Sequence, residues 1–440
     1  MKFYVHKLGC PKNDVDADYI VARLVDAGHS PVSDPEAADS IVVNTCGFIQ
    51  DAKQQSIDAI LELGLLKKEG SLKTLYAAGC LSQRYGDELL KGIEELDGAF
   101  GLGALEPLAE AVTTSARLKQ TARFDVRRLA YLDWRTRFVT DSYPYSYLKI
   151  SDGCDRECSY CAIPLMRGNF RSRPLESIVR EAEYLASQGK KELILVSQEA
   201  TLWNSDQGED CTLHHLIDAL ETVDGVEWIR LMYLHPARTD EALVERMASG
   251  GKTLDYFDLP LQHISTEVLR GMKRETNRRT IEALLARIAR LAPNATRRVG
   301  LMVGFPGETE EQFEELFDFV AEQKFERLGV FSFSSEEGTR AAEMPGALPE
   351  KVRLERVDRL MTLQQEIAFE RNSSLIGNSL KVIIDSVDGD RSAVGRTRGD
   401  CPEVDQTVMV NSPNLKIGDI QTVRIETTDG YDLVGSVVRE

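Results

Sequence analysis

The chain has 440 residues, of which 42% are hydrophobic and 28% are charged, and its formal net charge is −18. A chain of this length is too long to fold around a single hydrophobic core, so about two to four domains are expected. The strong acidity argues against a nucleic-acid substrate, whose phosphates need basic side chains, and favours a basic partner such as a ribosomal protein.

The sequence contains no apolar run of about eighteen residues that would predict a membrane-spanning helix. Its start, MKFYVHKLGC, lacks the apolar core of a signal peptide and is typical of a first β-strand. We therefore expect a cytoplasmic protein with no membrane partner. In that reducing compartment, clustered cysteines more often bind metal or carry out redox chemistry than form disulfides.

Residues 1–116 alternate between short apolar runs and helical stretches. The runs at 2–9, 39–46 and 73–80 are rich in Val, Ile and Tyr and predict strands, while a segment such as 16–28 has helical periodicity and ends on a glycine. Strands that alternate with helices form parallel sheets covered on both faces. An α/β, flavodoxin-like N-terminal domain is expected here.

Residues 117–139 form a basic segment that we interpret as a connector between domains. It is the one local feature that favours RNA, although a solvated pair of strands is the commoner explanation of such a charge run. The acidic residues of the segment are only Asp125 and Asp133. Its basic residues are Arg117, Lys119, Arg123, Arg127, Arg128, Arg135 and Arg137.

Residues 140–371 predict a second series of strands and helices. Six candidate strands lie at 147–154, 192–200, 229–236, 256–263, 297–307 and 327–334, and a long amphipathic helix near 350–371 closes the series. Six units fall short of the eight that close a full barrel, so we expect an open partial (βα)6 barrel of the TIM type. Its active site should lie at the carboxyl ends of the strands.

Residues 372–440 change to short β runs separated by Gly, Asp, Asn and Pro. Close spacing of such runs predicts a small antiparallel β-barrel. The segment holds 7 Lys and Arg against 11 Asp and Glu, so its net charge is 7 − 11 = −4.

Three cysteines, Cys154, Cys158 and Cys161, follow the first predicted strand of the second series with the spacing C-x3-C-x2-C. A closed zinc site or a fully ligated iron–sulfur cluster needs four ligands, and no fourth cysteine or histidine lies nearby. Three thiolates can hold a [4Fe–4S] cluster and leave one iron open to a substrate. The alternative is half of a zinc ribbon whose remaining ligand comes from elsewhere in the chain.

This motif, with Tyr160 directly before the last cysteine, resembles the signature of the radical S-adenosylmethionine (SAM) superfamily. The resemblance implies that the open iron binds the amino and carboxylate groups of SAM and that Tyr160 packs near the adenine. It also implies that an electron from the reduced cluster cleaves SAM to a 5′-deoxyadenosyl radical.

A second set of cysteines, Cys10, Cys46 and Cys80, is dispersed in sequence but follows three predicted strands, with Gly9, Gly47 and Gly79 beside them. In an open parallel sheet, ligand sites gather at the carboxyl ends of the strands. The three thiolates are therefore expected to meet and to hold a second [4Fe–4S] cluster. The alternative is that they are buried cysteines that act as small hydrophobic residues.

Two sets of three cysteines on separate domains resemble the methylthiotransferase family of radical-SAM enzymes along the whole chain. The resemblance implies an N-terminal methylthiotransferase domain (1–116), the connector (117–139), a radical-SAM core (140–371) and a C-terminal TRAM barrel (372–440). It further implies that a small electron carrier of the flavodoxin or ferredoxin type reduces the clusters. In that family, one SAM donates a methyl group at the second cluster and another SAM provides the radical, and the resemblance implies the same here.

The segments LGCPKNDVDAD and CAIPLMRGNFRSRP resemble the RimO branch of that family, in which an aspartate of small-subunit ribosomal protein twelve is methylthiolated at its β-carbon. The acidic C-terminal barrel also suits a basic protein better than an RNA. Two alternatives remain open. One is a transfer-RNA adenosine methylthiotransferase, and the other is a zinc-stabilised RNA-binding module without catalysis.

A few further residues are candidates at these sites. Gln198 and Glu199 end the second strand of the core, where members of the family contact polar groups of SAM, although an ordinary loop pair is an equal alternative. Asn13 and Asn44 could orient the thiolates of the second cluster or serve simply as turn residues. His263 is interpreted as structural, and Cys211 and Cys401, in polar loops, receive no role.

Overall fold

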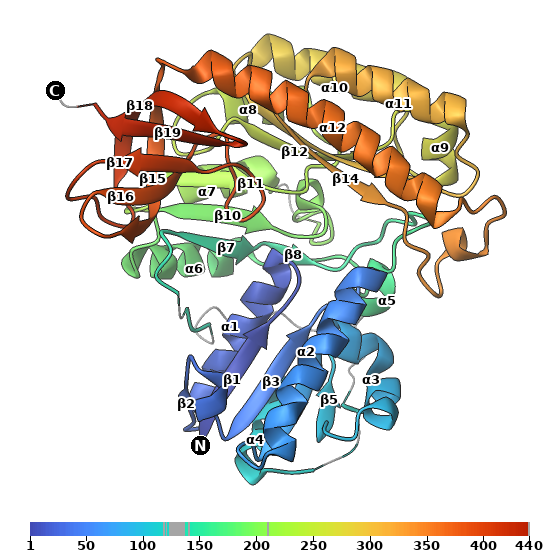
Figure 1. Ribbon diagram of the computed structural model, residues 1–440, viewed down its shortest axis with the longest axis vertical. Helices are drawn as coiled ribbons and strands as arrows, with labels where there is room; N and C mark the ends of the chain where they lie inside the picture. The colour runs from blue at the N-terminus through green and yellow to red at the C-terminus, as the bar shows by residue number, and fades with distance from the viewer. Residues whose placement is uncertain (118, 120, 123–136, 140, 209–210, 439–440) are drawn as a thin grey trace. The chain divides into compact units, whose positions relative to one another are not determined.

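The computed structural model describes residues 1–117, 119, 121–122, 137–139, 141–208 and 211–438 (Figure 1). The chain divides into two compact units. The first comprises residues 1–140, 151–178 and 334–342, and the second comprises 141–150, 179–333 and 343–440. Most of the predicted basic connector lies outside the described residues. In the described part of the chain, no helix is both long and apolar enough to cross a membrane.

The first unit is built on a six-stranded sheet of order β2-β1-β3-β4-β5-β6, in which every neighbouring pair is parallel. This order is the flavodoxin-like one and confirms the predicted fold of this part of the chain. The strands are β1 (Lys2–Lys7), β2 (Ser30–Pro31), β3 (Ser40–Thr45), β4 (Thr74–Gly79), β5 (Gly98–Phe100) and β6 (Thr121–Ala122).

Helices cover both faces of this sheet, and β3 and β4 are therefore buried on both sides. On one face, Val42 packs into a core with apolar residues of α1 and α4, and on the other face Ile41 and Val43 pack with those of α2 and α3. The helices are α1 (Pro11–Asp26), α2 (Gln50–Lys68), α3 (Cys80–Gly92) and α4 (Leu105–Thr114) (Figure 1). A short pair of strands, β8 (Ser151–Asp152) and β9 (Arg171–Ser172), and helix α5 (Ile163–Arg167) belong to the same unit.

The second unit contains the six predicted strands as two parallel sheets, of order β11-β10-β7 and β12-β13-β14. Leu234 N donates to the carbonyl of Asp258 at 2.9 Å, which joins the chain after β11 to β12. The predicted open partial barrel is thereby confirmed. Its strands are β7 (Tyr145–Lys149), β10 (Glu192–Val196), β11 (Trp228–Leu231), β12 (Tyr256–Gln262), β13 (Thr296–Val303) and β14 (Arg327–Ser332).

Helices follow the strands of the partial barrel, and α10, α11 and α12 lie along the outside of β12 and β14 (Figure 1). Their apolar faces supply the core, for example Ile281 and Leu285 in α10. The helices are α6 (Leu175–Ser187), α7 (Leu213–Glu221), α8 (Glu241–Ala248), α9 (Thr266–Gly271), α10 (Arg278–Leu291), α11 (Glu310–Gln323) and α12 (Glu350–Leu375).

The C-terminal segment forms a closed barrel of five strands, β15-β16-β17-β19-β18. It is antiparallel except for β17 and β19, which pair in parallel. The strands are β15 (Ser379–Asp388), β16 (Ser392–Thr397), β17 (Val408–Asn411), β18 (Ile420–Asp429) and β19 (Asp432–Val437). The sequence did not predict β16, because this strand contributes only Ala393 and Val394 as apolar residues, beside a glycine and charged neighbours.

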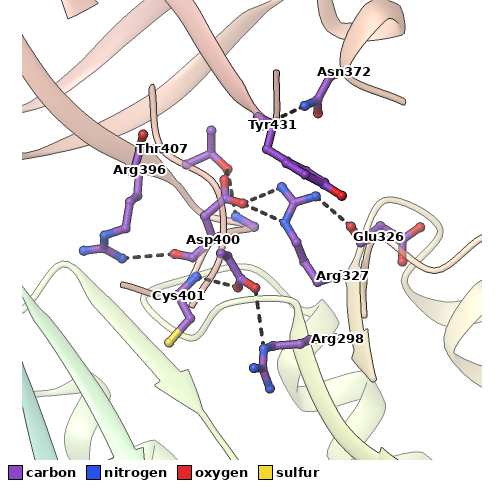
Figure 2. A network of polar contacts seen from close by, with 12 residues as sticks. Arg298, Glu326, Arg327, Asn372, Arg396, Asp400, Cys401, Thr407 and Tyr431 are labelled. Atoms are coloured by element: carbon purple, nitrogen blue, oxygen red, sulfur yellow. Dashed lines mark hydrogen bonds and ion pairs between the residues drawn. The ribbon is translucent and has the colours of Figure 1, made fainter. Parts of the chain in front are cut away.

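The loop between β16 and β17 anchors this C-terminal barrel to the partial barrel within the second unit. Figure 2 shows the Asp400 carboxylate beside Arg327, whose Nε donates to it at 2.9 Å. Asp405 of the same loop lies 3.5 Å from Nε of Arg298. Arg327 is the first residue of β14, so the loop contacts the amino ends of the partial-barrel strands. These ends are opposite the carboxyl ends at which an active site is expected.

A second buried group of charges completes this anchor. Glu192, the first residue of β10, is paired with Arg230 of β11 at 2.7 Å and with Arg396 of β16 at 2.8 Å, and these three side chains are at most 2% exposed. Arg396 also contacts Asp385 at 2.6 Å. Cys401, for which no role was expected, lies in this loop and is only 2% exposed. Burial raises the pKa of its thiol.

Candidate active site

The three dispersed cysteines of the first unit meet at the carboxyl edge of its sheet. Cys10 follows β1, Cys46 follows β3 directly, and Cys80 follows β4 directly and begins α3. Because β1, β3 and β4 are neighbouring parallel strands, the loops after them lie side by side. Cys46 and Cys80 are 8% and 6% exposed, and Cys10 is partly exposed.

The glycines beside these cysteines allow the loops to approach closely. A Cβ atom on Gly9 would lie 2.8 Å from Cβ of Cys46, and one on Gly47 would lie 2.9 Å from Cα of Leu81, the residue after Cys80. A Cβ on Gly79 would lie 2.5 Å from Oδ1 of Asn44. Any larger residue at these positions would push the cysteine loops apart, which explains why glycine accompanies each cysteine.

Gly79→Ala is expected to lower the amount of iron and sulfide that the first unit binds, while the protein still folds. Gly79 adopts φ +94°, and its Cβ would also meet the Thr45 carbonyl at 2.8 Å, so the substitution displaces the loop that carries Cys46. Iron and sulfide analysis after anaerobic reconstitution measures the loss. Gly70→Ala is the matched control, because Gly70 has φ +85° with nothing within 4 Å. Equal iron content in the two variants would contradict the prediction.

Asn13 and Asn44 hold the backbone of the cysteine loops. Asn13 Nδ2 donates at 3.0 Å to the carbonyls of both Leu8 and Thr45, which precede the loops of Cys10 and Cys46. Asn44 Nδ2 in turn donates to the Asn13 carbonyl at 2.7 Å. Oδ1 of Asn13 lies 3.7 Å from Sγ of Cys80. Asn13 thus contacts all three cysteine segments, and the alternative of a simple turn residue is the weaker interpretation.

The pKa values of the cysteines reflect their burial and their closeness to one another. Burial raises the pKa of Cys46, and it raises the pKa of Cys80 to about 12, while Cys10 raises both pKa values further through its proximity. Iron ligation requires thiolates and would therefore displace these protons. No group of three or more His, Cys, Asp or Glu among the described residues is arranged to share a single metal ion. In a [4Fe–4S] cluster each thiolate binds a separate iron, so that arrangement is not required.

The C-x3-C-x2-C loop lies between β8 and α5 in the first unit and folds back on itself. Cys154 N donates to the Gly168 carbonyl at 3.0 Å, and Cys161 N donates to the Cys158 carbonyl at 3.2 Å. Arg156 N donates to Sγ of Cys154 at 3.4 Å, which is the kind of contact that orients a thiolate. Cys154 is 8% exposed, and Cys158, Cys161 and Tyr160 are partly exposed.

Helix α5 connects this loop to the site of the other three cysteines. Ala162 and Met166 pack with Cys80 and Leu102 in one buried cluster. Arg167, at the end of α5, donates from Nη2 to Oδ1 of Asn13 at 2.8 Å. Arg167 lies in the segment CAIPLMRGNFRSRP, and no role was expected for it from the sequence. The signal was a single charge directly after the apolar run IPLM.

In the second unit, the predicted SAM contacts Gln198 and Glu199 follow β10 at its carboxyl end. Oε1 of Gln198 is buried and has no hydrogen-bond partner among the described residues, and the same is true of Oγ of Ser197. Glu199 accepts from Oγ1 of Thr201 at 3.1 Å and lies 3.7 Å from Nε of Arg238. Unpartnered buried oxygens at this strand end fit a polar ligand, and the SAM role of the pair stays a prediction.

His263 is fully buried and accepts a hydrogen bond from the backbone N of Ser265 at 3.0 Å through Nδ1. Burial, followed by the nearby Arg356, lowers its pKa to about 3. The imidazole is therefore neutral at physiological pH, which agrees with the structural role expected for it.

Family models match three parts of the chain. Residues 2–101 match "Uncharacterized protein family UPF0004", residues 148–320 match the "Radical SAM superfamily", and residues 376–438 match the "TRAM domain". Among curated relatives, the ribosomal protein uS12 methylthiotransferase RimO of Desulfitobacterium hafniense is 42% identical, over 100% of this chain and 99% of the relative. RimO of Thermoanaerobacter sp. is 43% identical over 97% and 98% of the two chains.

The chain belongs to the RimO family. Solved structures that resemble this RimO-family chain show its fold alone, because their sequence identity is low. The radical SAM methyltransferase TsrM from Kitasatospora setae, solved with cobalamin and a [4Fe-4S] cluster bound, is 16% identical. Its TM-score is 0.55, and the match covers 88% of this chain and 81% of TsrM. The cobalamin-dependent radical enzyme OxsB is 13% identical with a TM-score of 0.51, over 83% and 56% of the two chains.

Proposed function

We propose that this chain is a SAM-dependent methylthiotransferase that adds a methylthio group to the β-carbon of an aspartate in ribosomal protein uS12. The observation that carries the proposal is the likeness to RimO relatives at 42–43% identity over almost the entire length of each chain. The three family matches, which include the radical SAM superfamily, support the same class of enzyme.

We assign one [4Fe–4S] cluster to Cys154, Cys158 and Cys161 and a second to Cys10, Cys46 and Cys80. When bound, the clusters and SAM supply the radical chemistry and the methylthio group. The fit of the second site rests on the close approach of its three loops, which Asn13 holds through hydrogen bonds to two carbonyls. The fit of the site of Cys154, Cys158 and Cys161 rests on the loop between β8 and α5, where Arg156 N donates to Sγ of Cys154.

Three further residues are proposed to bind SAM. Gln198 has a buried, unpartnered Oε1 that can accept a hydrogen bond, and Glu199 carries a buried carboxylate that can accept from an ammonium or hydroxyl group. Tyr160 offers an aromatic face beside Cys161, suited to stacking on adenine. We propose the domain limits 1–116, 117–139, 140–371 and 372–440 for the methylthiotransferase domain, connector, radical-SAM core and TRAM barrel.

The charge of the chain supports a basic protein substrate. The whole chain carries −18 and the C-terminal segment carries 7 − 11 = −4, which complements a ribosomal protein and would repel the phosphates of an RNA. We propose that a small electron carrier of the flavodoxin or ferredoxin type reduces the clusters. Because the substrate is a ribosomal protein, the cytoplasm is the proposed site of action.

Intact-mass measurement of uS12 tests the function directly. Purified uS12 incubated anaerobically with the enzyme, SAM, a sulfide source and a reductant should gain the mass of one methylthio group at an aspartate. Transfer RNA incubated in parallel should remain unmodified. Methylthiolated adenosine with unmodified uS12 would favour the transfer-RNA alternative, and zinc without iron or sulfide in anaerobically prepared protein would exclude the enzyme.

A further inference from the structure

A buried guanidinium lies between the two sets of cysteines in the first unit. The side chain of Arg167 is 4% exposed. Its Nη2 donates to Oδ1 of Asn13 and to Asp16, both at 2.8 Å, and its Nη1 donates to Asp152 at 3.1 Å. Helix α5, which carries it, packs on Cys80 through Met166. Arg167 therefore occupies the space next to the proposed ligands of the N-terminal cluster.

We propose that Arg167 is a positioning residue that fixes a permanent positive charge beside the cluster of Cys10, Cys46 and Cys80, and thereby makes that cluster easier to reduce. This inference rests on the proposed function, because it takes these three cysteines as cluster ligands. It assigns to Arg167 no contact with substrate or SAM.

Simple electrostatics sets the direction of the effect. Reduction adds one electron from an external donor to the cluster site, and no bond forms or breaks. A nearby positive charge stabilises the more negative, reduced state, and the interaction is strong where water is excluded. Arginine keeps its charge at every relevant pH, so this contribution is constant.

The two carboxylates that pair with Arg167 offset only part of its charge at the site. Their side chains are 17% exposed at Asp16 and 15% at Asp152, against 4% for the guanidinium, so water screens them more. Their role is to hold the guanidinium fork in place. Arginine suits this position better than lysine, because its two terminal nitrogens reach Asp152 and Asn13 at the same time.

A redox titration followed by electron paramagnetic resonance tests the proposal on the full chain. Cys154, Cys158 and Cys161 are replaced by alanine so that only the N-terminal cluster is present, and dithionite is the reductant. Arg167→Met should lower the ratio of reduced to oxidised cluster at fixed potential by at least tenfold, or about 59 mV for one electron. Arg167→Lys should restore most of the ratio, and Asp16→Asn should raise it.

Iron and sulfide content separates the possible failures. If the three-alanine protein with Arg167 intact binds no cluster, the cysteine assignment in the proposed function is wrong, and this inference fails with it. If Arg167→Met holds a full cluster with an unchanged ratio, or if Met and Lys variants shift equally, only the role of Arg167 is overturned. If Arg167→Met cannot hold a cluster, Asp16→Asn becomes the test. An unchanged or lower ratio of reduced to oxidised cluster in Asp16→Asn would overturn the proposal.

Discussion

Cys10→Ala is expected to leave SAM cleavage close to the wild-type rate and to reduce methylthiolation of uS12 by more than about 100-fold, since changes in residues that merely support metal ligands already cost 10–100-fold. Cys10 belongs to the site at the edge of the six-stranded sheet, whereas Cys154, Cys158 and Cys161 lie in the separate loop between β8 and α5. Loss of the Cys10 thiolate leaves all three ligands of the other set intact. Chromatography of 5′-deoxyadenosine measures cleavage, and intact mass measures methylthiolated uS12.

Two other cysteine variants make this result specific. Cys154→Ala should abolish both SAM cleavage and methylthiolation, because it removes a ligand of the cluster that is proposed to bind SAM. Cys211→Ala should preserve both, since Cys211 belongs to neither set of proposed ligands and alanine keeps the backbone carbonyl that accepts a hydrogen bond from Asn204. Wild-type yield of methylthiolated uS12 from Cys10→Ala would show that Cys10 is not a cluster ligand.

Glu192→Ala is expected to destabilise the second unit by about 3–5 kcal/mol, the cost of removing one partner from a buried ion pair. Glu192 is fully buried between Arg230 and Arg396. Burial alone would raise the pKa of Glu192, but the charges of Arg396 and Arg230 lower it below its ordinary value. Without Glu192, the buried guanidinium of Arg230 loses its carboxylate partner, and that of Arg396 keeps only part of its neutralising charge, from Asp385. Urea denaturation followed by circular dichroism measures the shift of the midpoint.

Two controls show whether burial of the charges is the cause. Glu370→Ala breaks the ion pair of Glu370 with Lys324, in which the two side chains are 68% and 56% exposed. This substitution should lower the free energy of unfolding by only about 0–1 kcal/mol. The double variant Glu192→Gln with Arg230→Met removes one charge of each sign and should be more stable than Glu192→Ala. A midpoint for Glu192→Ala equal to that of Glu370→Ala would show that the network does not anchor the C-terminal barrel.

Most of the strands and helices, and the cysteines proposed as ligands, could be predicted from the sequence. The apolar runs at β3 and β4 predict buried strands because both of their faces are apolar, and each run ends directly before a cysteine. Parallel pairing then follows from the alternation of strands and helices, and the carboxyl ends of parallel strands, where Cys10, Cys46 and Cys80 lie, share one edge. These signals are local, so they can be read from short segments.

The polar residues that support those ligands could be identified only in the folded chain. Arg167 and Asn13 are 154 positions apart, and the bond between them depends on the packing of α5 against α3. Glu192 and Arg396 likewise come from β10 and β16, and β16 itself has too few apolar residues to be predicted. A charged side chain shows no periodic pattern of its own. Its partner is chosen by which surfaces are buried together, and that is settled only when the whole chain has folded.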